Sequence, residues 1–89
     1  MIKFSLHSEK QMYERNITKK EVTKVLRKPD QIIETRIKGR QIAQKVTTKN
    51  KKKFLYRVIF EITNGKKTVI TVYRTTKISK YIKEVKNEN

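Results

Sequence analysis

The pair Asn64-Gly65 constrains the fold of this chain more than any other feature. Asn-Gly is the commonest sequence of a two-residue hairpin turn, because both residues tolerate a positive φ angle. The segments on either side alternate with the two-residue period of a strand. They are KFLYRVIFEIT (53–63) before the turn and KKTVITVYRTT (66–76) after it. We therefore expect a long antiparallel hairpin.

A second hairpin is predicted upstream. The segments QIIETRI (31–37) and RQIAQKVTT (40–48) alternate in the same way, and Lys38-Gly39 between them has the composition of a turn. The segment KNKKK (49–53) joins the two hairpins, and its lysines predict a solvated, mobile connector. The sheet predicted from these segments is antiparallel and has four strands.

The chain before Pro29 follows a helical pattern. LHSEKQMYER (6–15) lacks glycine and β-branched residues, and Asn16 suits a left-handed C-terminal cap. Thr18 begins a second helix with the capping box T-K-K-E, and Pro29 ends that helix. Near the other end of the sequence, KISKYIKEVK (77–86) has apolar residues at helical spacing, which predicts a short C-terminal helix.

These elements predict a single α+β domain that spans residues 1–89. Two N-terminal helices pack on a four-stranded antiparallel sheet, and a short helix follows the last strand. We expect all of these helices to lie on one side of the sheet. A chain of 89 residues has room for one domain. It contains no cysteine and no apolar run long enough to span a membrane, so we expect a cytoplasmic protein with no membrane partner.

The net charge indicates the kind of partner. The chain has 24 Lys and Arg residues against 8 Asp and Glu, a formal charge of +16. Self-repulsion at this density destabilises a compact chain, so a polyanion, most often nucleic acid, is the simplest partner. A lysine-rich composition without a binding role is the other interpretation. The stretch 36–53 holds basic residues and no acidic one, and we predict that these bind nucleic acid: Arg36, Lys38, Arg40, Lys45, Lys49, Lys51, Lys52 and Lys53.

The register of the second hairpin decides which side chains share a face. A strict two-residue turn would pair Val58 with Thr71 and place a hydroxyl among the apolar residues. A G1 bulge at Gly65 shifts the pairing by one residue and pairs Val58 with Ile70 instead. We predict the bulged register, because it directs only apolar side chains toward the helices.

In that register Arg57, Thr71 and Tyr73 share the second, open face of the sheet, beside Ile59 and Val69 as an apolar floor. One interpretation is an ordinary wetted sheet face. The other is a working surface, because an arginine offers a fixed fork to a phosphate, and a tyrosine stacks on a base or shares a proton. The residues alone leave both interpretations open.

His7 is the only histidine, and it lies at the start of the first predicted helix. Imidazole is the side chain whose ordinary titration lies nearest to neutral pH, so His7 is a candidate acid or base. Arg15 lies about 80° around the helix from it, which allows a joint site without requiring one. The sequence shows no metal-ligand cluster, hydrolase carboxylate pair or glycine-rich phosphate loop. We therefore expect no cofactor, and chemistry of the kind that the 2′-hydroxyl of RNA makes available without a metal.

The order of these residues resembles a known family. The stretch FSLHSEKQMYERNITKKEVTKVLRKPDQII and the later LYRVIFEI and KKTVITVYRT are similar to domain-of-unknown-function family 4258, over roughly residues 2–75. That family is similar in turn to the compact α+β ribonucleases of RelE-like and BrnT-like toxins. The resemblance implies a RelE-like ribonuclease architecture, with the polar set of the family at His7, Arg15, Arg57, Thr71 and Tyr73.

Two positions depart from the family pattern. Gln11 stands where an arginine is frequent, which removes a phosphate contact. Asn16 stands where glycine is usual, and a left-handed helix cap tolerates that change.

The sequence thus predicts an RNA-binding protein, and in particular a metal-independent endoribonuclease of a toxin–antitoxin type that acts on free or ribosome-bound RNA. His7, Arg15, Arg57, Thr71 and Tyr73 are its predicted catalytic residues. Two alternatives remain open. A non-catalytic nucleic-acid-binding module would share the basic face but need no particular histidine. An interaction protein would instead dock an acidic, antitoxin-like protein on that face.

Overall fold

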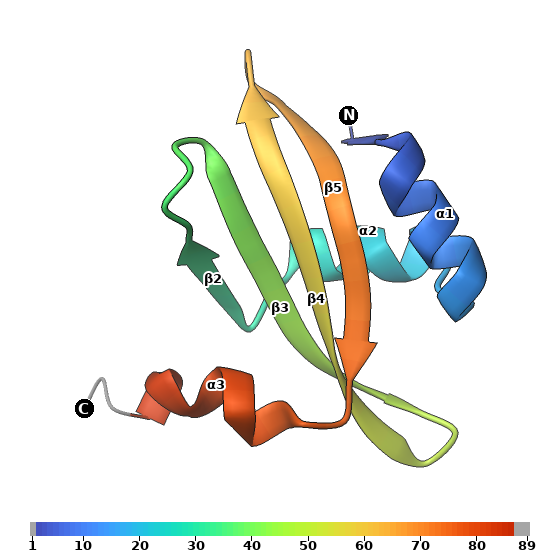
Figure 1. Ribbon diagram of the computed structural model, residues 1–89. Coiled ribbons are helices and arrows are strands. Elements are labelled where there is room, and N and C mark those ends of the chain that lie inside the picture. The colour runs from blue at the N-terminus through green and yellow to red at the C-terminus, as the bar shows by residue number, and fades with distance from the viewer. Residues whose placement is uncertain (1, 87–89) are drawn as a thin grey trace.

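The computed structural model describes residues 2–86 (Figure 1). The elements follow one another in the order β1 (Ile2–Phe4), α1 (Leu6–Arg15), α2 (Lys19–Arg27), β2 (Gln31–Glu34), β3 (Arg40–Lys49), β4 (Lys52–Thr63), β5 (Lys66–Thr75) and α3 (Ile78–Lys86).

The sheet formed by the described residues has five strands in the order β1-β5-β4-β3-β2. The α+β class is confirmed, but the predicted four-stranded antiparallel sheet is wrong, because β1 pairs with β5 in parallel. This strand covers only three residues, too few to show a period in the sequence. Its register joins Ile2 to Lys67, so the pairing depends on contacts between distant parts of the chain.

The turn at Asn64-Gly65 is a two-residue turn without the predicted bulge. Asn64 and Gly65 have φ angles of 53° and 76°, and Thr63 pairs directly with Lys66. The register shifts farther along, where Phe60 pairs with Val69 but Ile59 pairs with Thr71.

The shift leaves Ile70 as the unpaired extra residue of a β-bulge. Val58 consequently pairs with Val72, so the predicted pairing with Ile70 is wrong. Val69 is fully buried in the core beneath the helices, and its predicted place in the floor of the open face is also wrong. The bulge still directs Thr71 and Tyr73 to the same face as Arg57, as predicted.

The segment 49–53 is not a loose connector. Asn50 and Lys51 have φ angles of 54° and 65° and form a two-residue turn, with Lys49 paired to Lys52. The pairing of β3 with β4 therefore continues to the turn. The lysine composition led to the wrong prediction, because solvated lysines are compatible with the end of a twisted hairpin as well as with a loop.

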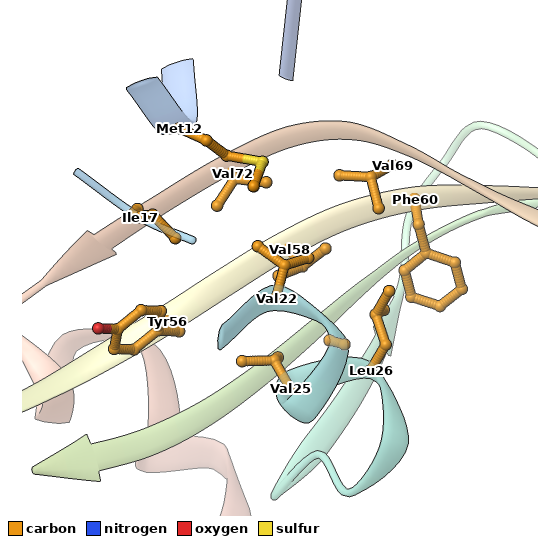
Figure 2. Packing of buried hydrophobic residues seen from close by; sticks show 11 residues of the cluster. Met12, Ile17, Val22, Val25, Leu26, Tyr56, Val58, Phe60, Val69 and Val72 are labelled. Carbon is orange, nitrogen blue, oxygen red and sulfur yellow. The ribbon is translucent and has the colours of Figure 1, made fainter. Parts of the chain in front are cut away.

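The two N-terminal helices begin and end where the sequence predicts. Asn16 caps α1 in the left-handed conformation, with a φ of 57° and a ψ of 47°. The capping box of α2 is complete: the Thr18 hydroxyl accepts from the Glu21 N–H, and the Glu21 carboxylate accepts from the Thr18 N–H. Both helices cover one face of the sheet, and their apolar side chains point at Val58 and Val72 (Figure 2).

Helix α3 lies on the opposite face, so the prediction that all helices share one side is wrong. Ala43 of β3 belongs to the core under α1 and α2, and the next residue, Gln44, faces the other way. The side chain of Gln44 donates a hydrogen bond to the backbone oxygen of Tyr81 in α3. Leu55 is also fully buried outside the main core cluster. The face that the sequence left open is thus partly covered.

Candidate active site

The guanidinium of Arg57 is held on the α3 face of the sheet by two neutral groups. Its Nε donates to the side-chain oxygen of Gln44 at 2.9 Å, and one terminal nitrogen donates to the Tyr73 hydroxyl at 2.5 Å. Arg57 and Tyr73 are cross-strand partners on β4 and β5. The centre of the guanidinium also lies 4.2 Å from the centroid of the Tyr81 ring, within cation–π distance. One strand pair and one helix thus fix the orientation of Arg57.

Gln44 organises this cluster and is fully buried. Its amide nitrogen donates to the side-chain oxygen of Gln31 at 2.6 Å and to the Tyr81 backbone oxygen at 3.2 Å, while its oxygen accepts from Arg57. Gln44, Gln31 and Tyr81 were not predicted as site residues from the sequence. One signal was present in the sequence. Gln44 lies between Ile42 and Val46 on an otherwise apolar face of the strand, and a buried amide on such a face needs hydrogen-bond partners.

The charge of Arg57 has no anionic partner among the side chains that the structure describes. The ion pairs seen there join other residues, such as Arg40 with Glu61 and Lys49 with Glu21. Tyr73 and Gln44 orient the guanidinium without neutralising it. A half-buried, oriented arginine of this kind is suited to bind a phosphate or carboxylate with the nitrogens that remain.

Thr71 lies on the same face as this pair, two residues before Tyr73 on β5. It is half-buried and pairs with Ile59 across the strands. The predicted grouping of Arg57, Thr71 and Tyr73 on one face is therefore confirmed.

Arg15 instead contacts the edge of β5. Beyond the short strand β1, no strand of the described range 2–86 pairs with this edge, and side chains of α1 take the place of one. Arg15 donates to the Val72 carbonyl at 3.2 Å, and Gln11, one helical turn earlier, accepts from the Val72 N–H at 3.0 Å. Ser5 adds a bond to the Ile70 carbonyl. The structure therefore gives Gln11 and Arg15 a role in closing a sheet edge.

His7 is exposed on α1, one helical turn before Gln11 and on the same row of the helix. None of the hydrogen bonds seen among the described residues joins His7 to Arg57, Thr71 or Tyr73. The predicted catalytic set is thus divided: three residues share one sheet face, Arg15 contacts the edge of β5, and His7 lies exposed beside that edge.

The predicted basic stretch does not form one surface. Arg40 and Lys49 occupy the two ends of β3, roughly 30 Å apart at the rise of an antiparallel strand. Arg40 pairs with Glu61, and Lys49 pairs with Glu21 at 3.3 Å. Lys45 donates to the Lys28 carbonyl at 2.9 Å. The remaining basic residues are exposed in turns or at strand ends: Arg36, Lys38, Lys51, Lys52 and Lys53.

A second basic surface, which was not predicted from the sequence, lies on the helix side of the sheet. Lys24, Arg27 and Lys28 line a hollow of about 450 Å³ together with Lys45 of β3. The signal was visible as basic residues at helical spacing near the end of α2. Asp30 lies 4.0 Å from the Lys45 ammonium and reduces the positive charge there.

Glu21 links α2 to the sheet beneath it. Tyr56 donates its hydroxyl proton to the Glu21 carboxylate at 3.0 Å, and Lys49 donates at 3.3 Å. Burial favours the neutral carboxylic acid, but hydrogen bonds from Thr18, Tyr56 and Lys49 outweigh it and lower the pKa of Glu21. Burial, and then the contact with Glu21, raise the pKa of Tyr56. These contacts stabilise the fold and lie on the face opposite Arg57.

Two further observations bear on the kind of site. Among the side chains that the structure describes, no three His, Cys, Asp or Glu residues gather closely enough to hold a metal ion. No helix among residues 2–86 has the length and apolar character that crossing a membrane requires.

Comparison with known proteins gives a family but no characterised relative. Neither the curated proteins nor the solved structures contain a significant match. The model of one family, described as domain of unknown function (DUF4258), matches residues 4–74. This range covers most of the chain, includes every predicted catalytic residue and ends before α3. The resemblance to this family is therefore confirmed, whereas the likeness to RelE-like and BrnT-like toxins stays a prediction. The chain belongs to the DUF4258 family.

Proposed function

We propose that this protein binds RNA in the cytoplasm and cleaves it without a metal ion, as an endoribonuclease of a toxin–antitoxin type. The observation that carries the proposal is the guanidinium of Arg57. Tyr73 and Gln44 hold it in place, and no carboxylate among the described side chains neutralises it. A phosphodiester supplies the missing negative charge.

The cluster can stabilise the phosphate and protonate the leaving group in such a cleavage. The 2′-hydroxyl of RNA attacks the adjacent phosphorus, the bond to the 5′-oxygen of the next nucleotide breaks, and a 2′,3′-cyclic phosphate remains. Arg57 neutralises the charge that builds on the phosphate oxygens. Tyr73 accepts a hydrogen bond from Arg57, so its own hydroxyl proton is directed elsewhere and can pass to the leaving 5′-oxygen. Thr71, on the same face, can orient the phosphate.

The 2′-hydroxyl must also lose a proton, and His7 is the remaining candidate to accept it. Its exposed imidazole lies at the edge of β5, outside the Arg57 cluster. An RNA strand bound across β5 would have to reach both His7 and the Arg57 cluster. We therefore treat His7 as a base supplied from the rim of the site, and Arg57 and Tyr73 as its centre.

The surroundings of Arg57 offer a path for the RNA backbone. Lys53 lies four residues before Arg57 on the same face of β4, roughly 13 Å away at the rise of a strand. Lys51 and Lys52, exposed at the adjoining turn, extend the positive charge. An RNA strand that follows these lysines would place a phosphate at Arg57.

Incubation of the protein with structured and ribosome-bound RNA in EDTA, followed by analysis of the RNA ends, tests the proposal. We expect cyclic-phosphate ends with wild-type protein and with Lys20→Ala, whose exposed lysine lies on α2, on the side of the sheet opposite Arg57. Arg57→Ala and Tyr73→Phe should abolish or strongly reduce these ends. RNA that stays uncut under every condition would overturn the proposal.

A second candidate function is binding of RNA without cleavage. It is favoured by the contact of the Tyr81 ring with Arg57 at 4.2 Å, which places α3 over part of the site, and by the position of His7 outside the cluster. Binding that weakens steeply with salt but is unaffected by His7→Ala and Tyr73→Phe would support it. Co-purification with a small acidic protein would instead indicate a docking role for the basic surface.

A further inference from the structure

Beside Arg57, between β2 and α3, lies a hollow of about 570 Å³. Figure 1 shows α3 passing close to the end of β2 where that strand begins. The residues that line the hollow are Gln31, Ile32, Ile33, Arg57, Lys80 and Tyr81. Its volume is in the range of sites that bind small organic ligands, roughly 300–1,000 Å³.

The lining combines the groups that a nucleotide requires. Two cations stand beside one aromatic ring: the Arg57 guanidinium lies 4.2 Å and the Lys80 ammonium 5.4 Å from the centroid of the Tyr81 ring. Ile33 adds an apolar wall on the same face of β2 as Gln31. Gln31 uses its side-chain oxygen to accept from Gln44, so its amide nitrogen can donate to the edge of a base.

The basic hollow at α2 and β3 offers a contrast. Lys24, Arg27, Lys28 and Lys45 line it, but it has no aromatic ring, and Asp30 contacts Lys45. Those groups suit a phosphate alone. Of these two hollows, only the one next to α3 combines positive charge with an aromatic and an apolar surface.

Helix α3 lies beyond the part of the chain that the family model matches. The family match ends at residue 74, whereas Lys80 and Tyr81 belong to α3. Helix α3 therefore contributes a ring and a cation that the matched region does not supply. The buried Gln44 fixes the backbone of Tyr81, so the ring is held where it meets the Arg57 cluster.

We propose that this hollow is a nucleotide pocket, which binds one nucleotide of a single-stranded RNA beside the phosphate held at Arg57. The phosphate of that nucleotide lies toward Lys80 and Arg57, and its base packs beside Tyr81 and Ile33. Stacking on an aromatic ring tolerates any base, so the pocket selects an unpaired nucleotide more strongly than a particular sequence. The inference rests on the proposed function, because it assigns the pocket to the same RNA.

Titration of the ¹⁵N-labelled full-length protein with adenosine monophosphate, uridine monophosphate and inorganic phosphate tests the pocket. We expect both nucleotides to shift the amide signals of Ile33, Lys80 and Tyr81, and to bind more tightly than phosphate. Tyr81→Leu should weaken nucleotide binding about tenfold and leave phosphate binding nearly unchanged. Lys80→Gln should weaken both, whereas the control Lys77→Gln, which does not line the pocket, should weaken neither.

Equal affinities for phosphate and nucleotides, or shifts confined to Lys24 and Arg27, would overturn the pocket. Lys80→Gln changes an exposed side chain, so it remains informative if Tyr81→Leu fails to fold. The nucleotide pocket and the cleavage activity can be refuted independently of each other. RNA cleavage without nucleotide shifts at α3 would refute the pocket alone, whereas nucleotide binding at α3 by a protein that leaves RNA intact would refute cleavage alone.

Discussion

Replacing Gln44 with alanine tests the network that orients Arg57. The fully buried amide of Gln44 bonds to Arg57, Gln31 and Tyr81. The bond from the guanidinium is charge-assisted, and its loss costs about 1.5–3 kcal/mol. Each of the two neutral bonds adds about 0.5–1.5 kcal/mol. Water that reaches the half-buried partners in the variant offsets part of this sum.

We expect Gln44→Ala to lower the free energy of unfolding by about 2–4 kcal/mol, measured by urea denaturation followed by circular dichroism. The slope of the transition should stay unchanged, because the surface exposed on unfolding is nearly the same. Cleavage of RNA should also fall, since Arg57 loses the acceptor that holds its Nε.

Gln41→Ala is the matched control. Gln41 lies on the same strand but on the opposite face, and its amide donates to an exposed carboxylate oxygen of Glu34 at 3.1 Å. Its replacement should change the free energy of unfolding by less than about 0.5 kcal/mol. Equal losses in Gln44→Ala and Gln41→Ala would show that the buried hydrogen-bond network adds nothing to stability.

Three further outcomes follow from the structure. Arg15→Ala should cost about 1 kcal/mol in urea unfolding yet keep RNA cleavage, because Arg15 bonds to the edge of β5, and loss of cleavage at unchanged stability would contradict this. Gly65→Ala should lower the free energy of unfolding by about 1 kcal/mol, because residue 65 has a φ of 76°, and an unchanged melting temperature would refute it. In the folded protein the pKa of Glu21 lies below its ordinary value of 4.5. The ionised carboxylate therefore stabilises the fold above pH 4.5, and this stabilisation is lost as the pH falls through the folded pKa. Wild-type protein should therefore lose more stability than Glu21→Gln between about pH 6 and pH 3, and equal losses would contradict the role of Glu21.

The local elements could be predicted because their signals are local. The capping box at Thr18, the cap at Asn16 and the turn at Asn64-Gly65 each depend on neighbours within a few residues. Strand β1 and the bulge at Ile70 could not be predicted, because each depends on pairing with segments that are distant or out of register. The predicted bulge at Gly65 is absent, and the bulge at Ile70 was not predicted. Thr71 nevertheless shares a face with Arg57, because either bulge shifts the pairing of β5 before it reaches Thr71.

The shared face of Arg57 and Tyr73 could be predicted from the alternation of side chains along the strands, whereas the contacts of Gln44 and Tyr81 could not. Arg57 and Tyr73 share a face because alternation along β4 and β5 fixes where their side chains point. The buried amide of Gln44 and the ring of Tyr81 join them through β3 and α3, and nothing in the sequence indicates that α3 packs on this face. The number of basic residues in the stretch 36–53 did not indicate which of them are free to bind a partner, since Arg40 and Lys49 form ion pairs with carboxylates of the same chain.

The most direct test of the account is the single-turnover rate of RNA cleavage by Arg57→Lys in EDTA, at saturating protein, beside Arg36→Lys as the matched control. A lysine keeps the charge but cannot bond to Gln44 and Tyr73 and hold a phosphate in the same geometry. We expect Arg57→Lys to cleave at least about a hundredfold more slowly than wild type, and Arg36→Lys to cleave at the wild-type rate. Cleavage by Arg57→Lys at the wild-type rate would contradict the claim that the oriented guanidinium is the centre of the site.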